Sequence, residues 1–383
     1  MNPDVWQTIA EHTVFDSLGS ISALRSVCRA AWQGVDSDCV RRSGSRGRHF
    51  VIKGQFHPVQ KLVFRVHADT VESVDASGTW DLVGDECLAI VPNIASLQAS
   101  DNPKITTVLP FAHSLTALRA ADGSGIGDDG LAMVRGIKSL DASDNPNITT
   151  VAPFAETLTQ LSAQRRSGIS DSGLVAARRL TTLNMTENQA ITTVAPFAAT
   201  LTRLKARGQT GLNDAGLAAA HAIITLDVSF NQEIVSVLPF ARSLTKLTAP
   251  GTSGISDEGL REAHNIRILE ARDNSRITTV APFASSLTKL GAGFNSGIND
   301  DGLRLATRLQ TLNAAENHKI TSILPFAASL TLLNACGSCG ISDAAMAAAG
   351  PNLFHVVAYG NPQIAAPSRI DVTKEFPADS DSD

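Results

Sequence analysis

One dipeptide recurs so regularly that it limits the folds open to this chain. Pro-Phe returns every 43 residues, and an asparagine precedes each copy in constant phase. The prolines are Pro110, Pro153, Pro196, Pro239, Pro282 and Pro325, and the asparagines are Asn102, Asn145, Asn188, Asn231, Asn274 and Asn317. Because a unit of this size cannot bury its own apolar face, neighbouring units must stack and share one core. The chain is therefore predicted to form an elongated array.

Each block divides into two related halves of about 22 and 21 residues. Both halves contain L-x-x-L-x-[AVM], an alternating pattern that predicts a short strand with one buried face. In one block these positions are Leu158, Leu161, Ala163, Leu180, Leu183 and Met185. The strands are predicted to lie side by side in a parallel sheet. Thirteen strand centres run from Leu97 to Val356, and Val74 is a degenerate fourteenth.

Three residues between the strands have predicted structural roles. The recurring asparagine is suited to binding backbone groups in a tight bend. The proline fits the first turn of a short outer helix. An aspartate in the I-x-D-x-G-L segment is predicted to cap the helix that begins with the following Gly-Leu. These aspartates are Asp128, Asp171, Asp214, Asp257 and Asp300.

The repeated pattern resembles the leucine-rich repeat family, whose strand signature is LxxLxLxxNxL. The I-x-D-x-G-L half resembles the cysteine-containing subfamily, although within the repeats only Cys336 supplies a matching cysteine. The third inward position is usually alanine rather than leucine, which predicts thinner or more tightly packed layers. The resemblance covers about 280 residues. It implies an α/β solenoid with a parallel sheet, outer helices or turns and two alternating repeat types.

Composition agrees with a repeat array and excludes several other classes. Hydrophobic residues make up 43% and aromatic residues only 5% of the 383, so the core must consist of aliphatic side chains. The net charge of -5 argues against a nucleic-acid partner for the whole chain. The five cysteines are odd in number and scattered, as expected in a reducing compartment. Neither a signal peptide nor a membrane span is recognisable, which predicts a cytoplasmic or nuclear protein.

Residues 1–40 have apolar positions at helical spacing and no repeat pattern. This segment resembles an F-box, with its most specific match in Leu-Arg-Ser-Val-Cys-Arg followed by a tryptophan. The matching residues are Pro3, Asp4, Val5, Ile9, Leu18, Leu24, Val27, Cys28, Arg29 and Trp32. Two positions depart from that family: Asn2 replaces its leading leucine, and Trp32 stands one residue late.

The F-box resemblance implies a substrate adaptor of a cullin-type (SCF) ubiquitin ligase. Pro3, Val5, Ile9, Leu24, Val27 and Trp32 would bind a Skp1-like adaptor, and the repeats would hold the substrate. The alternative is a free-standing scaffold whose N-terminal helices only shield the open end of the array.

The remaining boundaries follow from composition. Residues 41–95 are predicted to contain an exposed basic linker, at 41–49, and strands that begin the sheet. Residues 96–366 form the solenoid, and 367–383 an acidic, disordered tail.

Strand residues that do not point inward are predicted to form a concave face. The first-half strands supply Arg203, Lys205, Arg207, Lys246 and Lys289, and the second-half strands supply acids that include Asp141, Asp144, Glu187, Asp227, Glu270, Asp273 and Glu316. Basic and acidic stripes should therefore alternate. They either neutralise each other across the sheet or form a docking surface for a protein. Phe230 breaks the acidic pattern near the centre and is a candidate anchor.

Catalysis finds no support in the sequence. The nine histidines follow no repeat phase, and neither a nucleophile triad nor a zinc-protease or phosphate-loop motif is present. Cys336 and Cys339 form a C-x-x-C without the second pair that a structural zinc site requires. The predictions are therefore a binding protein, no enzyme, and no cofactor or metal.

Overall fold

The computed structural model describes residues 40–43, 47–51, 71–79, 83–365 and 371–372. The chain divides into two compact units, Met1–Leu180 and Thr181–Asp383. Each unit is described by itself.

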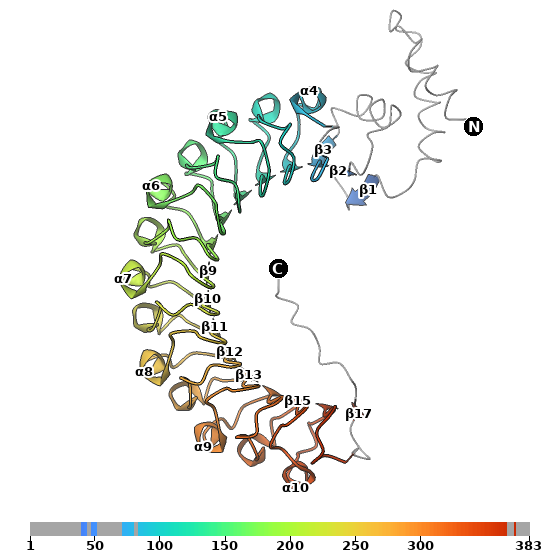
Figure 1. Cartoon of the computed structure of the whole chain (residues 1–383), viewed down its shortest axis with the longest axis vertical. Helices are drawn as coiled ribbons and strands as arrows, with labels where there is room; N and C mark the ends of the chain where they lie inside the picture. Colours follow the sequence, from blue (N-terminus) through green and yellow to red (C-terminus); the bar gives the residue numbers. More distant parts are fainter. Residues whose placement is uncertain (1–39, 44–46, 52–70, 80–82, 366–370, 373–383) are drawn as a thin grey trace, which may run out of the picture. The chain divides into compact units, whose positions relative to one another are not determined.

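The first unit consists of short strands in a single sheet (Figure 1). They are β1 (Val40–Ser43), β2 (Gly47–Val51), β3 (Val71–Asp75), β4 (Ser96–Gln98), β5 (Ala117–Arg119), β6 (Ser139–Asp141) and β7 (Gln160–Ser162). Strands β1 and β2 pair antiparallel, and every later pair from β2 to β7 is parallel. The helices between strands are α4 (Asp85–Leu88), α5 (Asp128–Leu131) and α6 (Asp171–Leu174), with 3-10 helices η2 (Leu109–Phe111) and η3 (Ala152–Phe154).

The second unit continues the same element order. Its strands are β8 (Thr182–Asn184), β9 (Arg203–Lys205), β10 (Thr225–Asp227), β11 (Lys246–Thr248), β12 (Ile268–Glu270), β13 (Lys289–Gly291), β14 (Thr311–Asn313), β15 (Leu332–Asn334), β16 (His355–Val357) and β17 (Asp371–Val372). Neighbours from β8 to β17 pair in parallel.

The helices of the second unit lie on the side opposite the strands (Figure 1). They are α7 (Asp214–Leu217), α8 (Asp257–Leu260), α9 (Asp300–Leu303), α10 (Asp343–Met346), and the 3-10 helices η4 (Ala195–Phe197), η5 (Leu238–Phe240), η6 (Ala281–Phe283) and η7 (Leu324–Phe326). The recurring proline lies in the first turn of each 3-10 helix, as predicted from its fixed φ and missing N–H.

In each unit the core is a stack of similar layers. The middle residue of every strand from β4 to β16 is buried, as is Val74 in β3, and these are the predicted positions from Val74 to Val356. Outside the strands, the phenylalanine of each Pro-Phe pair is at most 1% exposed. Those residues are Phe111, Phe154, Phe197, Phe240, Phe283 and Phe326. Alternation along three-residue strands therefore orients one apolar residue inward and its two neighbours outward.

The recurring asparagine binds the repeat before it, as its side chain predicts. Asn231 is fully buried, and its Nδ2 donates to the carbonyl of Ala206 at 2.9 Å and to Oγ1 of Thr210 at 2.9 Å. Its Oδ1 accepts from the backbone N–H of Glu233 at 2.9 Å. Asn145 makes the corresponding bonds to Ala120 in the first unit. The asparagines thus satisfy backbone groups that stacking would otherwise leave unpaired.

The predicted capping role of the recurring aspartate was wrong. Helix α8 begins at Asp257 itself, and that side chain accepts from the backbone N–H of Thr278 at 2.9 Å and of Thr279 at 3.2 Å, in the following half-repeat. The residue before the aspartate is the N-cap, and Asn213 accepts there from the N–H of Gly216 at 3.1 Å. A carboxylate at the first helical position points away from its own helix, so it binds the next repeat instead.

Two strands lie where the sequence predicts no strand. All of β1 except Val40, and the start of β2, lie within 41–49, the predicted linker, and β17 lies within the predicted tail. A Gly/Ser-rich stretch between pairing residues is also typical of a hairpin turn. Strand β17 pairs with β16 and so adds a strand to the end of the array.

Candidate functional site

The predicted site residues lie together on β9–β13 and the turns that follow these strands, all in the second unit. Two rows of residues flank the buried middle positions of these strands, and the register of pairing defines both. We call the residues at the first strand position the entry row: Arg203, Thr225, Lys246, Ile268 and Lys289. We call those at the third position the exit row: Lys205, Asp227, Thr248, Glu270 and Gly291.

The entry row contains bases and no acid. Arg203, Lys246 and Lys289 stand on alternate strands, with Thr225 and Ile268 between them. At roughly 4.8 Å per strand, successive bases are about 10 Å apart. Arg203 is exposed, whereas Lys246 and Lys289 are half-buried. Positive charge is therefore spread evenly along this end of the strands.

The exit row contains the acids of these strands. Asp227 lies beside Lys205 in the register, so here opposite charges stand directly across from each other. Glu270 lies beside Thr248 and Gly291, and its carboxylate occupies the space that a Cβ at Gly291 would require. The predicted alternation of basic and acidic strands is present on β9–β13. Most bases and acids nevertheless lie at opposite ends of the strands.

Asp227, expected on the exposed face, is buried. Its side chain is 7% exposed, against 47% for that of Arg207. Its Oδ2 accepts from Nε of Arg207 at 2.6 Å and lies 2.5 Å from Nη2, and its Oδ1 accepts from the N–H and Oγ of Ser229 at 3.1 and 2.5 Å. Each carboxylate oxygen of Asp227 thus has two polar contacts within the protein. Asp227 positions Arg207 rather than facing solvent.

A turn after each strand contains a residue with left-handed backbone. In β9–β13 these residues, which we call the turn column, are Gly208, Phe230, Gly251, Asp273 and Phe294, with φ between 57° and 67°. Glycine adopts this conformation at no steric cost, whereas a bulky side chain there is unusual. The same position is a non-glycine in other turns, including Asp101, Asp122, Asp144, Arg165, Glu187 and Glu316.

Two members of the turn column are exposed aromatics. Phe230 is 58% exposed, and its ring covers Gly251 so closely that a Cβ there would overlap it. Phe294 is 42% exposed, with the guanidinium of Arg272 5.4 Å from its ring centroid. Asp273, between them in the column, accepts from the backbone N–H of Asn295 at 3.2 Å. The 43-residue period does not relate Phe294 to Phe230, because Phe294 follows a first-half strand and Phe230 a second-half strand. Their equivalence appears only when the two half-repeats are superposed.

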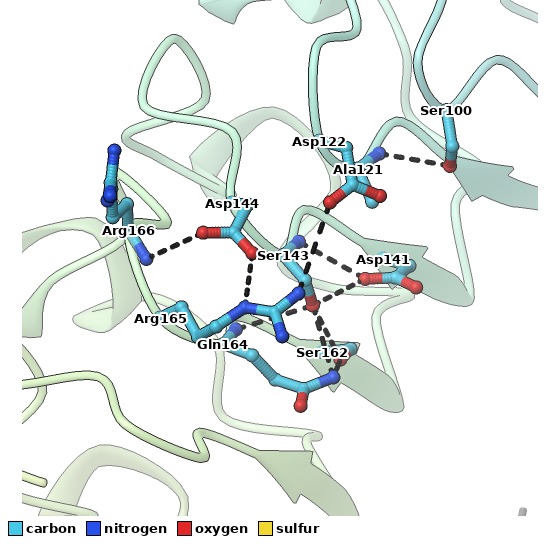
Figure 2. Close-up of polar contacts among 10 residues, drawn as sticks. All are labelled: Ser100, Ala121, Asp122, Asp141, Ser143, Asp144, Ser162, Gln164, Arg165 and Arg166. Atoms are coloured by element: carbon cyan, nitrogen blue, oxygen red, sulfur yellow. Dashed lines mark hydrogen bonds and ion pairs between the residues drawn. The ribbon is translucent and has the colours of Figure 1, made fainter. Parts of the chain in front are cut away.

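A second polar cluster lies at the corresponding turns of the first unit (Figure 2). Arg165, with φ 51°, bonds the carboxylate of Asp144 and lies 4.0 Å from that of Asp122. Ser143 Oγ contacts Asp141 Oδ1 at 2.7 Å and Ser162 Oγ at 2.9 Å. Arg165 thus pairs with Asp144, and Asp141 is bound by Ser143, so these acids are held by groups of the same unit.

The two cysteines of the C-x-x-C segment, Cys336 and Cys339, both have raised thiol pKa values. Burial raises the pKa of the Cys339 thiol to about 11 and also raises that of Cys336. A raised pKa keeps both thiols protonated near neutral pH, and the thiolate is the form that binds metals and attacks disulfides. Among the residues that the structure describes, no cluster of three or more His, Cys, Asp or Glu side chains could hold a metal ion. In the same part of the chain no helix is long and apolar enough to cross a membrane.

The residues predicted to bind a Skp1-like adaptor lie outside the described residues. They are Pro3, Val5, Ile9, Leu24, Val27 and Trp32.

No family model and no curated protein matches this sequence. Solved structures do match. The internalin InlF of Listeria monocytogenes is 19% identical, and the match covers 87% of this chain and 94% of that protein with a TM-score of 0.56. A leucine-rich repeat protein of Leptospira interrogans is 13% identical over 78% of this chain and 80% of its own, with a TM-score of 0.48. The fold is thus an α/β leucine-rich repeat solenoid, as the repeated pattern implied.

Proposed function

We propose that this chain is a repeat scaffold that binds a polypeptide partner on the strand side of β9–β13. The observation that carries the proposal is Phe230, which is 58% exposed in a backbone conformation that disfavours bulky residues. Large exposed aromatics beside arginines are typical of the residues that dominate protein interfaces. A binding scaffold requires no catalytic group, cofactor or metal.

Mutual neutralisation accounts for part of this surface but not for all of it. The pair of Arg207 and Asp227 stabilises adjacent repeats whether or not a partner binds. Phe230 contributes no charge, and Gly208 and Gly251 fill the same position in neighbouring turns. The ring is therefore not required by the fold, which favours a contact with another molecule.

Site-directed photo-crosslinking tests the proposal in the cells that express the protein. A benzophenone amino acid replaces Thr248, in the exit row, or Ala219, an exposed residue after α7 as the matched control. We expect a discrete cross-linked protein from position 248 alone, and its loss when Phe230→Gly is added. Equal products from both positions, or none from 248, would refute a strand-side partner.

We also propose a finer role, a substrate adaptor of a cullin-type ubiquitin ligase, which rests on the F-box resemblance of residues 1–40. In this role the N-terminal segment binds a Skp1-like protein and the repeats hold the substrate. The test is co-purification of the full chain with a Skp1-like protein, using Val27→Ala and Trp32→Ala as disrupting variants. Absence of binding by the unaltered chain would leave the alternative, a free-standing scaffold with a helical cap.

A further inference from the structure

The surface of β9–β13 is positively charged although the chain is not. The two rows and the turns contain the bases Arg203, Lys205, Arg207, Lys246, Arg272 and Lys289, and the acids Asp227, Glu270 and Asp273. The whole chain has a net charge of -5. Bases therefore exceed acids here while acids exceed bases overall, so this surface attracts ligands of negative charge.

The three acids of this surface differ in their exposure. Asp227 is bound by Arg207 and Ser229 and is almost without solvent contact. Asp273 accepts from the backbone N–H of Asn295 at 3.2 Å and from its Nδ2 at 3.3 Å. Glu270 lies against Gly291. Asp227 is therefore sequestered, whereas Glu270 is half-buried and Asp273 is exposed. The entry row, by contrast, contains only basic and neutral side chains.

The two aromatic rings supply the apolar part of the surface. The ring of Phe230 lies against Gly251, and the guanidinium of Arg272 lies over the ring of Phe294, so each ring has a contact within the protein. Three strand steps separate them, or about 14 Å at the usual spacing of roughly 4.8 Å. About four residues of extended polypeptide span that distance.

We propose that the partner contributes an acidic polypeptide segment, with apolar side chains seated on Phe230 and Phe294 and carboxylates directed to Arg203, Lys246 and Lys289. This inference rests on the proposed function and names the chemistry of the partner. An acid on about every third residue of an extended segment matches the spacing of about 10 Å between the entry-row bases.

A peptide-binding assay tests this chemistry on the full chain. The probe is a fluorescein-labelled twelve-residue peptide in which pairs of glutamates alternate with pairs of leucines. Its binding is measured by fluorescence anisotropy at 50 and 300 mM NaCl. Matched peptides replace glutamate by glutamine, glutamate by lysine, or leucine by serine. We expect each replacement to weaken binding at least tenfold. The higher salt concentration should weaken binding of the glutamate–leucine peptide by a similar factor, because the distance over which charges interact shortens as ionic strength rises.

Variants assign the binding to this surface. Lys246→Glu together with Lys289→Glu should weaken the glutamate–leucine peptide at least tenfold. Arg242→Glu with Arg304→Glu, two exposed bases beside η5 and α9, should change it less than twofold. Phe230→Gly should weaken it at least fivefold, whereas Leu238→Ala, which removes a 55% exposed side chain from η5, should leave it unchanged.

Three outcomes would overturn the inference. Binding of the lysine or glutamine peptide as tightly as the glutamate peptide would exclude an acidic partner. Equal loss in both pairs of charge-reversed variants would place the peptide elsewhere. Binding seen only with a chain ending at residue 372 would assign the surface to the acidic segment 373–383 of the same chain. A positive photo-crosslink with any of these outcomes would leave the proposed function standing and refute only the acidic chemistry.

Discussion

Removing the carboxylate of Asp227 tests how the candidate surface is held together. In Asp227→Ala, Arg207 loses both of its contacts to Oδ2, and Ser229 loses the acceptor for its N–H and its hydroxyl. The consequences for these two residues differ. The side chain of Arg207 is 47% exposed and can be hydrated, whereas Ser229 is 6% exposed. The buried amide and hydroxyl of Ser229 are therefore left without an acceptor.

The size of the effect follows from these contacts. Loss of one partner of a fully buried ion pair costs about 3–5 kcal/mol, but Arg207 does not remain buried and uncompensated. A buried donor left unsatisfied costs about 1–3 kcal/mol, and Ser229 contributes two. We expect Asp227→Ala to lower the free energy of unfolding by about 2–4 kcal/mol. Asp227→Asn retains an acceptor for Ser229, so it should cost less.

Equilibrium urea unfolding followed by circular dichroism measures the difference. The matched control is Glu270→Ala, two strands away in the exit row, where loss of a partly exposed acid should cost less than about 1 kcal/mol. A double-mutant cycle with Arg207→Ala should give a coupling energy of about 1–2 kcal/mol. Equal stabilities of the Asp227 and Glu270 variants would refute the assignment of Asp227 as a buried structural carboxylate.

Three further predictions follow from burial and charge. Leu183→Ala removes a side chain with no exposure and should cost about 2–5 kcal/mol in the same urea assay; a cost under 1 kcal/mol would contradict its place in the core. Reversing the charges of Lys205 and Glu270, which stand three strands apart, should weaken partner binding at least fivefold and leave the melting temperature nearly unchanged, whereas a large drop in that temperature would favour a structural role for these charges. Because burial raises the pKa of Cys339 from 9.0 to about 11, folding favours its neutral thiol, so stability should be constant below pH 9 and fall between pH 9 and 11; a Cys339→Ser variant that shows the same fall would refute this cause.

The architecture followed from the 43-residue period because identical spacing forces identical layers. Val74, Leu97 and Val356 are buried strand residues, as predicted, and the asparagines and prolines have the predicted roles. These features depend on local spacing, which sequence periodicity records directly.

Other features depend on contacts that spacing does not record. The aspartate of each I-x-D-x-G-L segment was recognised as structural, but its partner lies 21 residues further along the chain rather than in its own helix. The burial of Asp227 depends on how far Arg207 reaches across to the next strand. Phe294 was overlooked because its equivalence to Phe230 appears only when the turns share one backbone conformation. The sequence thus predicts a candidate surface on β9–β13, but neither the burial of Asp227 nor the exposed ring of Phe294.

The hydrogen bonds of the recurring aspartates and asparagines have a consequence for how such a chain can change in length. The recurring aspartates Asp128, Asp214, Asp257 and Asp300 bind 21 or 22 residues ahead. The recurring asparagines Asn102, Asn145, Asn231, Asn274 and Asn317 bind 19 to 26 residues behind. Every repeat therefore presents the same donors and acceptors to its neighbour, wherever it stands within its unit. Duplication or deletion of a complete 43-residue block would recreate the same junction, whereas a change of a few residues would disconnect it. The binding surface can therefore become longer or shorter in evolution only by whole double repeats, if the junctions between repeats are to be preserved.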